Sequence, residues 1–216
     1  LYLRPYMESN NKFSMSIDAD PEIQGVLIKN QAMILEPNRQ QQLKQKGYGE
    51  MDKSKLLLKS FESLYLLFTD RLALFRGNKK IDFDSFLQIC KKHDKDILTK
   101  FLVYRDLRNR GYTVKDGLDF GSDFRVYDKP FSPKSPSKFL VFGLNEGKHE
   151  KMSELRKKIE RITKIDKKPI IAVVQRQGEI IYYKISRMNF TKITKIGWEW
   201  LWILIHYLYT AHSVVY

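Results

Sequence analysis

The first half of the chain alternates short apolar runs with segments of helical periodicity. The stretch IQGVLIKNQAMILE (23–36) contains two short alternating apolar runs on either side of Asn30, a pattern that predicts a β-hairpin. The next segment, KSKLLLKSFESLYLLFTDRLAL (53–74), spaces its apolar side chains as on one face of a helix. These side chains are Leu57, Phe61, Leu64, Tyr65 and Phe68.

A second helix is predicted after the break in the pattern at RGNKK (76–80). Asp82 or Asp84 can cap its N-terminus, and the helix is expected to stop at Gly111. The apolar positions that define this helix are Phe86, Ile89, Ile97, Phe101, Leu102 and Leu107. The first half therefore predicts a small α+β unit made of short strands and two helices.

The second half predicts a mixed sheet with one helix laid on it. Three strand-like segments, YTVKD (112–116), DFRVY (123–127) and SKFLVFGL (137–144), are separated by turn residues. An amphipathic helix, EKMSELRKKIERITKI (150–165), and two further strands follow. The apolar face of that helix consists of Met152, Leu155, Ile159 and Ile162. The first of the two strands, PIIAVV (169–174), is apolar throughout and is expected to be central, with both faces covered.

The predicted fold class is α+β in two domains. A small N-terminal α+β domain is expected over residues 20–100 and a mixed β-sheet domain with packed helices over residues 101–190. Residues 1–20 are polar and irregular, and residues 191–216 form an apolar tail that holds all three tryptophans. The uninterrupted apolar part of this tail, WLWILI, is far shorter than the roughly 20 residues that span a bilayer. We therefore expect the tail to pack on the body or on a partner; an interfacial anchor is the less favoured alternative.

Composition adds a strong positive charge and a single thiol. Lys and Arg number 39 against 25 Asp and Glu, which gives a formal net charge of +14. Two interpretations of this charge stay open: a polyanionic partner, most simply nucleic acid, or a basic surface that keeps the protein in solution. The lone cysteine, Cys90, excludes an internal disulfide and fits a reducing cytoplasm, and its apolar neighbours predict a buried side chain. The first residues lack the apolar core of a signal peptide.

The motifs of metal and phosphate-loop enzymes do not occur. The four histidines are scattered and have no Cys or carboxylate at ligand spacing, and the glycines form no phosphate-binding loop. We therefore expect no metal and no cofactor. The segment 104–127 instead interleaves basic and aromatic residues, as an RNA-stacking surface does, and so does a helix-to-strand junction whose rings point inward.

Three segments resemble the archaeal tRNA-splicing (tRNA-intron) endonucleases. The block FLVYRDLRNRGYTVKDGLDFGSDFRVYDK (101–129) is similar to the signature block of that family. KKPIIAVVQRQGEIIYYKISRM (167–188) is similar to its closing strands, and KGYGEMDKSKLLLKSFESLYLL (46–67) to its N-terminal part. The resemblance covers about residues 20 to 190 and implies that the C-terminal domain is nuclease-like.

The resemblance implies a metal-independent cleavage of precursor tRNA at a bulge-helix-bulge motif. In that family the 2′-hydroxyl attacks the adjacent phosphate and leaves a 2′,3′-cyclic phosphate and a 5′-hydroxyl. The family uses a tyrosine, a histidine and a lysine, which map onto Tyr127, Pro136 and Lys167. Proline has no titratable group, so the remnants Tyr127 and Lys167 lack the third partner. The resemblance therefore implies a structural, non-catalytic subunit that works in a heterotetramer with a catalytic subunit and precursor tRNA.

The same resemblance implies which residues would form the subunit interfaces and which would bind RNA. The closing strand would pair with that of the catalytic subunit through Ile181, Tyr183 and Ile185. An acidic loop at 143–154 would dock on the opposing dimer through Glu146 and Glu150, although a solvated loop explains these residues equally well. Arg161 would grip the flipped bulge base by a cation–π contact, or is an ordinary surface residue.

Two alternatives to the structural-subunit role stay open. The first is a competent endonuclease that uses Tyr127 and Lys167 with a non-standard acid, such as the imidazole of His149. The second is an RNA-binding or assembly module without any nuclease role.

Overall fold

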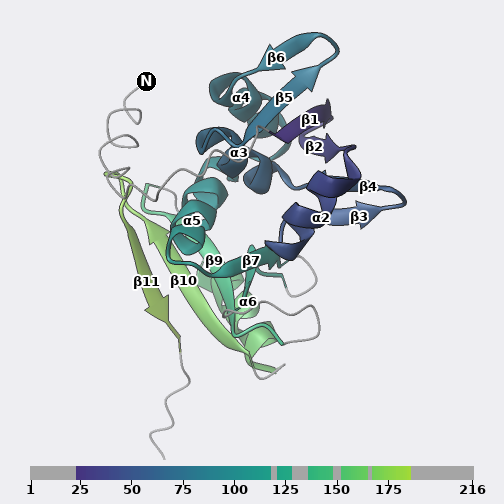
Figure 1. Cartoon of the computed structure of the whole chain (residues 1–216). Coiled ribbons are helices and arrows are strands. Elements are labelled where there is room, and N and C mark those ends of the chain that lie inside the picture. The colour runs from purple at the N-terminus through teal and green to yellow at the C-terminus, as the bar shows by residue number, and fades with distance from the viewer. Residues whose placement is uncertain (1–22, 118–120, 128–135, 148–151, 165–166, 186–216) are drawn as a thin grey trace, which may run out of the picture. The chain divides into compact units, whose positions relative to one another are not determined.

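The computed structural model describes residues 23–117, 121–127, 136–147, 152–164 and 167–185 (Figure 1). All of them fall within one compact unit, Leu1–Ile185. They form one six-stranded and one five-stranded sheet with helices, which confirms the predicted α+β class. Residues 1–20, which were expected to be irregular, and the tail 191–216 lie outside the described residues.

The N-terminal sheet is mixed, in the order β3-β4-β2-β1-β5-β6. The central β1 pairs with β2 in antiparallel register, Val26 opposite Met33, and with β5 in parallel register. Lys29 adopts a left-handed φ of 55° at the β1–β2 turn beside Asn30, so the predicted hairpin is confirmed. The strands are β1 (Ile23–Ile28), β2 (Gln31–Ile34), β3 (Glu50–Asp52), β4 (Lys55–Leu58), β5 (Leu72–Arg76) and β6 (Lys79–Ile81).

Four helices accompany this sheet, where the sequence predicted two. They are α2 (Pro37–Gln45), α3 (Ser60–Phe68), α4 (Phe83–His93) and α5 (Ile97–Asn109). The single helix expected between Asp82 and Gly111 is wrong, because Asp94 is extended (φ −141°, ψ 109°) and its Oδ1 accepts the Asp96 N–H at 2.9 Å. Asp82 does cap α4, since its Oδ1 accepts the Ser85 N–H at 3.2 Å. Leu57 lies in β4, so α3 is shorter than its apolar spacing suggested.

The C-terminal sheet has the order β11-β10-β9-β8-β7. Its one parallel pair is β9–β10, and α6 connects these two strands. The elements are β7 (Thr113–Asp116), β8 (Phe124–Tyr127), β9 (Phe139–Asn145), α6 (Met152–Lys164), β10 (Lys168–Val174) and β11 (Ile180–Lys184). Every strand and the helix predicted for this half are confirmed.

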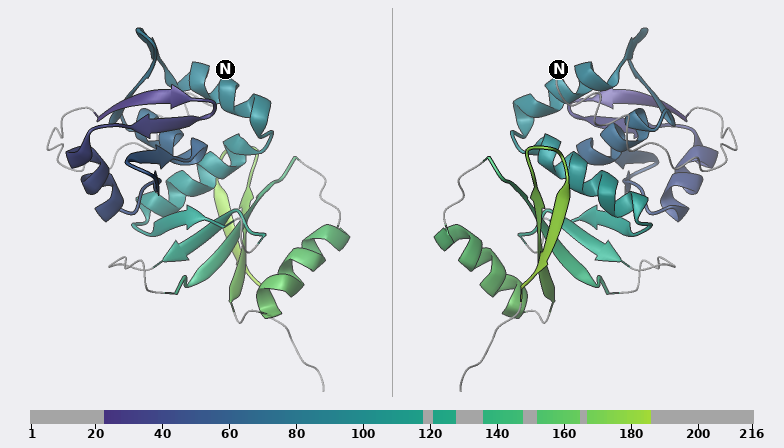
Figure 2. Two further views of the ribbon diagram at one scale, coloured as in Figure 1. Left: turned by 90° about the vertical axis from the view of Figure 1, so that its right-hand side faces the viewer. Right: turned by 90° about the vertical axis from the view of Figure 1, so that its left-hand side faces the viewer.

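Helices α5 and α6 cover opposite faces of the C-terminal sheet (Figure 2). On one face Val141, Ala172 and Val174 join the large core that contains α5. On the other face Leu140 and Phe142 pack with Ile162 of α6. Both helices contact β10, which confirms the prediction of a central strand covered on both faces.

One apolar core joins the N-terminal part to the C-terminal sheet. The ring of Phe61 on α3 lies 5.0 Å from Tyr104 on α5 and 5.1 Å from Phe124 on β8, centroid to centroid. Cys90 is fully buried in the same core, as predicted. The expected boundary between residues 100 and 101 falls within α5 and stays a prediction.

Candidate functional site at one end of strands β8, β9 and β10

Strand register brings the positions of Tyr127, Pro136 and Lys167 to one end of the C-terminal sheet. Val126 lies opposite Phe139 in the β8–β9 pair, and Phe139 lies opposite Lys168 in the β9–β10 pair. Tyr127 is the last residue of β8, Pro136 lies just before β9, and Lys167 directly precedes β10. Residues that are far apart in sequence therefore meet where three neighbouring strands begin or end.

The alternation of β8 directs the Tyr127 side chain away from the main core. Phe124 and Val126 are buried in that core, whereas Arg125 and Tyr127 are half-buried on the other face of the strand. Thr113 on β7 is the cross-strand neighbour of Tyr127.

Lys167 is held next to the start of β9. Its Nζ donates to the carbonyl oxygen of Ser137 at 3.3 Å, and its N–H donates to the Ile162 carbonyl at 3.4 Å. Ser137 is only 9% exposed, whereas the adjoining Pro136 is exposed. The ammonium group thus lies one residue from the position where the family resemblance expects a histidine.

The part of the chain that the structure describes contains one histidine, and it lies elsewhere. His93 ends α4, which packs on α3 and α5 in the N-terminal part. His149, the alternative acid, lies outside the described residues. Within the described ranges, the sheet end therefore combines a phenol and an ammonium group without an imidazole.

Arg161 lies beside the turn that leads into β8. A Cβ placed on Gly121 would lie 3.8 Å from Arg161 Nη1, and the Arg161 side chain on α6 is exposed. Gly121 has a φ of +67°, which favours glycine at this turn. An exposed guanidinium at this place is compatible with stacking on a base and with an ordinary surface role.

Glu146 binds a turn of its own sheet. Its Oε2 accepts the Arg176 N–H at 3.0 Å, and its own N–H donates to the Val174 carbonyl at 3.0 Å. The carboxylate therefore fastens the end of β9 to the β10–β11 turn. Glu150 lies outside the described residues.

Strand β11 forms an edge with apolar side chains on its exposed face. It pairs with β10 and with no other described strand. Ile181 is 38% and Tyr183 52% exposed. The third predicted residue, Ile185, is half-buried and extends the ladder by donating its N–H to the Pro169 carbonyl at 3.1 Å.

The comparisons with known proteins agree with this arrangement. Residues 97–182 match the family model of the tRNA intron endonuclease, catalytic C-terminal domain, and residues 23–87 match that of its N-terminal domain. A tRNA-splicing endonuclease of Methanococcus vannielii is 35% identical over 148 residues, 68% of this chain and 84% of the relative. The tRNA-splicing endonuclease of Pyrococcus furiosus is 34% identical over 145 residues, 67% of this chain and 84% of the relative.

The chain belongs to the tRNA intron endonuclease family. The resemblance drawn from its sequence motifs is therefore confirmed at the level of the family. The match to the catalytic C-terminal domain includes Tyr127, Pro136 and Lys167 as well as the exposed residue Ile181.

In this tRNA intron endonuclease family member, the basic and aromatic segment 104–127 turns two of its four described rings fully inward. Tyr104 and Phe124 are fully buried, which confirms the inward-facing interpretation for these two residues. Arg108 stacks its guanidinium 4.0 Å above the Tyr48 ring and donates to the Lys46 carbonyl at 3.1 Å. Phe120 lies outside the described residues.

Sequence patterns missed a buried carboxylate beside this segment. Glu62 is 2% exposed, and its two oxygens accept the Gly49 N–H at 3.0 Å and the Lys59 N–H at 2.8 Å. Lys115 approaches the same loop and donates to the Gly49 carbonyl at 2.8 Å. Burial raises the pKa of Glu62 and lowers the pKa of Lys115, and each charge partly offsets the effect on the other. Glu62 is flanked by serine and phenylalanine in an ordinary helical stretch, so nothing in the sequence marked it.

The described ranges contain neither a metal-binding cluster nor a membrane-spanning helix. They contain no group of three or more His, Cys, Asp and Glu side chains that could hold a metal ion. No helix within them is long and apolar enough to cross a membrane.

Proposed function

We propose that this chain is the structural, non-catalytic subunit of a heteromeric tRNA-intron endonuclease that cleaves precursor tRNA at a bulge-helix-bulge motif. The observation that carries the proposal is the proline at position 136, beside the end of the sheet where Tyr127 and Lys167 lie. A catalytic subunit would supply the complete set of catalytic groups, and this chain would position it and the RNA. As a protein with a single, buried cysteine, it would work in the reducing cytoplasm.

The chemistry of RNA cleavage explains why one residue matters so much. Attack by a 2′-hydroxyl requires a group that takes its proton, a group that protonates the departing 5′-oxygen, and a cation near the charge that develops on the phosphate. A phenol and an ammonium group can serve two of these needs. Proline can neither donate nor accept a proton, and general acid–base assistance is typically worth about 10²–10⁴ in rate. The chain should therefore cleave poorly by itself.

The exposed edge of β11 supports assembly with a second subunit. An unpaired strand edge offers backbone N–H and C=O groups to another chain, and charged side chains are one of the devices by which natural edges avoid such pairing. Here Ile181 and Tyr183 place apolar surface on that edge, and Ile185 extends it. We propose these three residues as the contact with the catalytic subunit.

Docking and RNA contacts complete the proposal. Glu146 and Glu150 would be the acids of the docking loop, and Glu146 would bind a partner while its Oε2 accepts the Arg176 N–H. Arg161 would contact the bulge of the precursor tRNA from its place beside Gly121.

Co-expression tests the proposal. The full chain would be produced with each tRNA-splicing endonuclease homologue of the same genome and measured by size-exclusion chromatography with light scattering. We expect a hetero-oligomer that cleaves bulge-helix-bulge RNA. A homo-oligomer of this chain that ignores every homologue and cleaves the RNA by itself would overturn the assignment.

A second candidate function is a metal-independent endonuclease with a different acid. It is favoured by one observation, that Tyr127 and Lys167 are both present and lie at the same end of the sheet. His149→Ala tests it, because this change abolishes cleavage by the chain if His149 is the acid and changes nothing if the chain is non-catalytic.

A further inference from the structure

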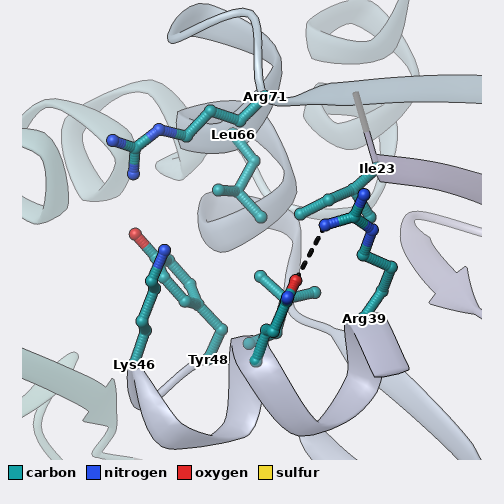
Figure 3. Close-up of a pocket in the computed structure, with 8 residues that line it drawn as sticks. Ile23, Arg39, Lys46, Tyr48, Leu66 and Arg71 are labelled. Carbon is teal, nitrogen blue, oxygen red and sulfur yellow. Dashed lines mark hydrogen bonds between the residues drawn. The ribbon is translucent and has the colours of Figure 1, made fainter. Parts of the chain in front are cut away.

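A small pocket in the N-terminal part of the molecule is lined by three cationic side chains. Arg39 and Lys46 come from α2 and its C-terminal cap, whereas Arg71 directly precedes β5 and reaches the pocket from the opposite wall (Figure 3). Tyr48 forms part of the lining, and the buried Leu43 and Leu66 close its floor. None of the residues discussed so far as catalytic or interface residues belongs to this lining.

No acidic residue lines the pocket among the residues that the structure describes. Arg39 donates to Gln42 Oε1 at 2.8 Å, and its only described carboxylate partner is the exposed Glu36, 3.9 Å away. The Arg71 guanidinium has no hydrogen bond or ion pair with any described residue. A fourth cation, Arg108, stacks on the Tyr48 ring at 4.0 Å. Arg71 therefore has no described carboxylate beside it and Arg39 has only the distant Glu36, which favours an anionic ligand between these two arginines.

The size of the pocket restricts what that anion can be. Its volume is about 20 Å³, which is room for one water-sized group. A nucleobase or a whole nucleotide does not fit into that space. An oxygen of a phosphate group fits, with the rest of the phosphate at the mouth, where the planar guanidinium of Arg71 or Arg39 can bind it through two parallel hydrogen bonds.

The pocket adjoins the strand that carries Tyr127. Gly47 stands between the lining residues Lys46 and Tyr48, and a Cβ placed on it would lie 2.5 Å from Thr113 Cγ2. Thr113 is the cross-strand neighbour of Tyr127, and paired residues of antiparallel strands lie about 5 Å apart. Figure 1 shows the C-terminal end of α2 beside β7. A polynucleotide that lies on the Tyr127 end of the sheet therefore passes close to the pocket.

We infer that this pocket binds a backbone phosphate of the precursor tRNA, so that the N-terminal domain grips the RNA together with the C-terminal sheet. The identity of the RNA rests on the proposed function, whereas the phosphate chemistry rests on the pocket itself. We expect this contact to be independent of RNA sequence, because phosphate contacts position a nucleic acid and do not distinguish its bases.

The test compares two double variants that remove the same charge. Arg39→Gln with Arg71→Gln empties the pocket of two cations. Arg76→Gln with Lys79→Gln removes two exposed cations from the β5–β6 hairpin, at the opposite end of β5 from Arg71. Binding of the full chain to a bulge-helix-bulge RNA is measured by fluorescence anisotropy over a series of salt concentrations, after thermal unfolding has verified each fold.

We expect the pocket variant to bind RNA about tenfold more weakly, as the loss of a charge-assisted phosphate contact implies. The slope of log K against log salt should also become shallower by about 0.7–0.9, the amount for one phosphate. The hairpin variant should stay within about twofold of the wild type. Strand β5 separates its charges from Arg71 by five residues of about 3.3 Å each, which is more than the Debye length of about 10 Å. Equal effects of the two variants, or none, would overturn the inference. Arg71→Gln alone gives the answer if the double variant does not fold, because Arg71 has no described side-chain partner to lose.

Two further measurements separate the possible causes of a negative result. Titration with inorganic phosphate distinguishes a site for a small free anion: saturable phosphate binding that Arg71→Gln abolishes, with RNA affinity unchanged, contradicts the RNA assignment. Light scattering with a catalytic subunit tests the proposed function independently. A chain that fails to assemble but still needs the pocket for RNA binding refutes the proposed function alone, and a chain that assembles with pocket-independent RNA binding refutes this inference alone.

Discussion

At position 136 a pyrrolidine ring adjoins the carbonyl that holds Lys167, and the effect of replacing it can be measured directly. Pro136 is exposed, so a larger polar side chain should be tolerated there. We expect Pro136→His to introduce cleavage of bulge-helix-bulge RNA, with a gain of up to about 10²–10⁴ over the wild-type chain. The measurement is the rate at which 2′,3′-cyclic phosphate ends appear.

Pro136→Ala is the matched control, because it removes the ring without adding an imidazole. Adding Tyr127→Phe to Pro136→His should abolish the gain. No gain from the histidine would contradict the idea that Tyr127 and Lys167 are already arranged for catalysis.

The buried Glu62 carboxylate predicts a loss of stability on a conservative change. Both of its oxygens accept backbone N–H groups, whereas glutamine has one acceptor oxygen and an NH₂ group that can only donate. Glu62→Gln therefore leaves one buried N–H without a partner, at a cost of about 1–3 kcal/mol in the free energy of unfolding. Urea unfolding measures this, with the exposed Glu179→Gln as the control, for which we expect less than about 0.5 kcal/mol.

The difference in unfolding free energy between the wild type and Glu62→Gln should depend on pH, and the sign of this dependence follows from the pKa of Glu62. Burial raises the pKa of Glu62, so the folded protein binds this proton more tightly than the unfolded chain does. The stability that this proton adds is fully present below the unfolded pKa and is lost as the pH rises through the folded pKa. The stability difference between wild type and Glu62→Gln should therefore shrink as the pH rises from acidic toward neutral values. A difference that widens over this range would contradict the raised pKa.

At the scale of elements, β11 carries the prediction for assembly. A lysine in place of Ile181 puts a charge on the exposed face of the edge strand, where charges oppose pairing with another chain. We expect Ile181→Lys to leave the fold of the chain unchanged and to abolish the hetero-oligomer seen by light scattering. Glu179→Lys, exposed in the neighbouring β10–β11 turn, is the control and should assemble normally. Undiminished assembly of Ile181→Lys would mean that the partner binds elsewhere.

The sequence predicted the elements of the C-terminal half well and those of the N-terminal half less well. Strands β8 to β10 and helix α6 each alternate or space their buried apolar residues with a clear period, which the sequence shows directly. Helix α2 was missed because Leu43 is its only large apolar residue that is buried. It is fixed instead by the buried Gln40 amide, which donates to the carbonyls of Ile34, Leu35 and Ser54 at 2.9, 3.1 and 3.1 Å.

The interruption between α4 and α5 is a second feature that the spacing of apolar residues did not predict. The apolar side chains of both helices continue one face closely enough to suggest a single helix. Two aspartates break it, since the Asp94 side chain binds the Asp96 N–H and also pairs with Lys100 Nζ at 2.7 Å. Side chains that hydrogen-bond to the backbone compete with the helix, and hydrophobic spacing does not reveal this competition.

At the scale of the whole molecule, the candidate site depends on contacts that are distant in sequence. Family resemblance supplied Tyr127 and Lys167, and strand register then explained why they lie at one end of the sheet. The sequence did not predict the pocket of Arg39 and Arg71, because each arginine resembles an ordinary surface cation in the sequence. Only the fold brings the residue before β5 and helix α2 to the same pocket. The core that contains Phe61 of α3 and Phe124 of β8 packs the described N-terminal part, which holds the pocket, against the C-terminal sheet, which holds the candidate site.

The most direct test of the account is cleavage by the chain on its own. The purified chain of 216 residues is incubated, without any partner, with a precursor tRNA that contains a bulge-helix-bulge motif. Single-turnover rates are compared with those of the Methanococcus vannielii relative under the same conditions. We expect a rate at least about 10² lower than that of the relative, because one proton-transfer group is missing. Cyclic-phosphate ends that form as fast as with the relative would contradict the non-catalytic assignment.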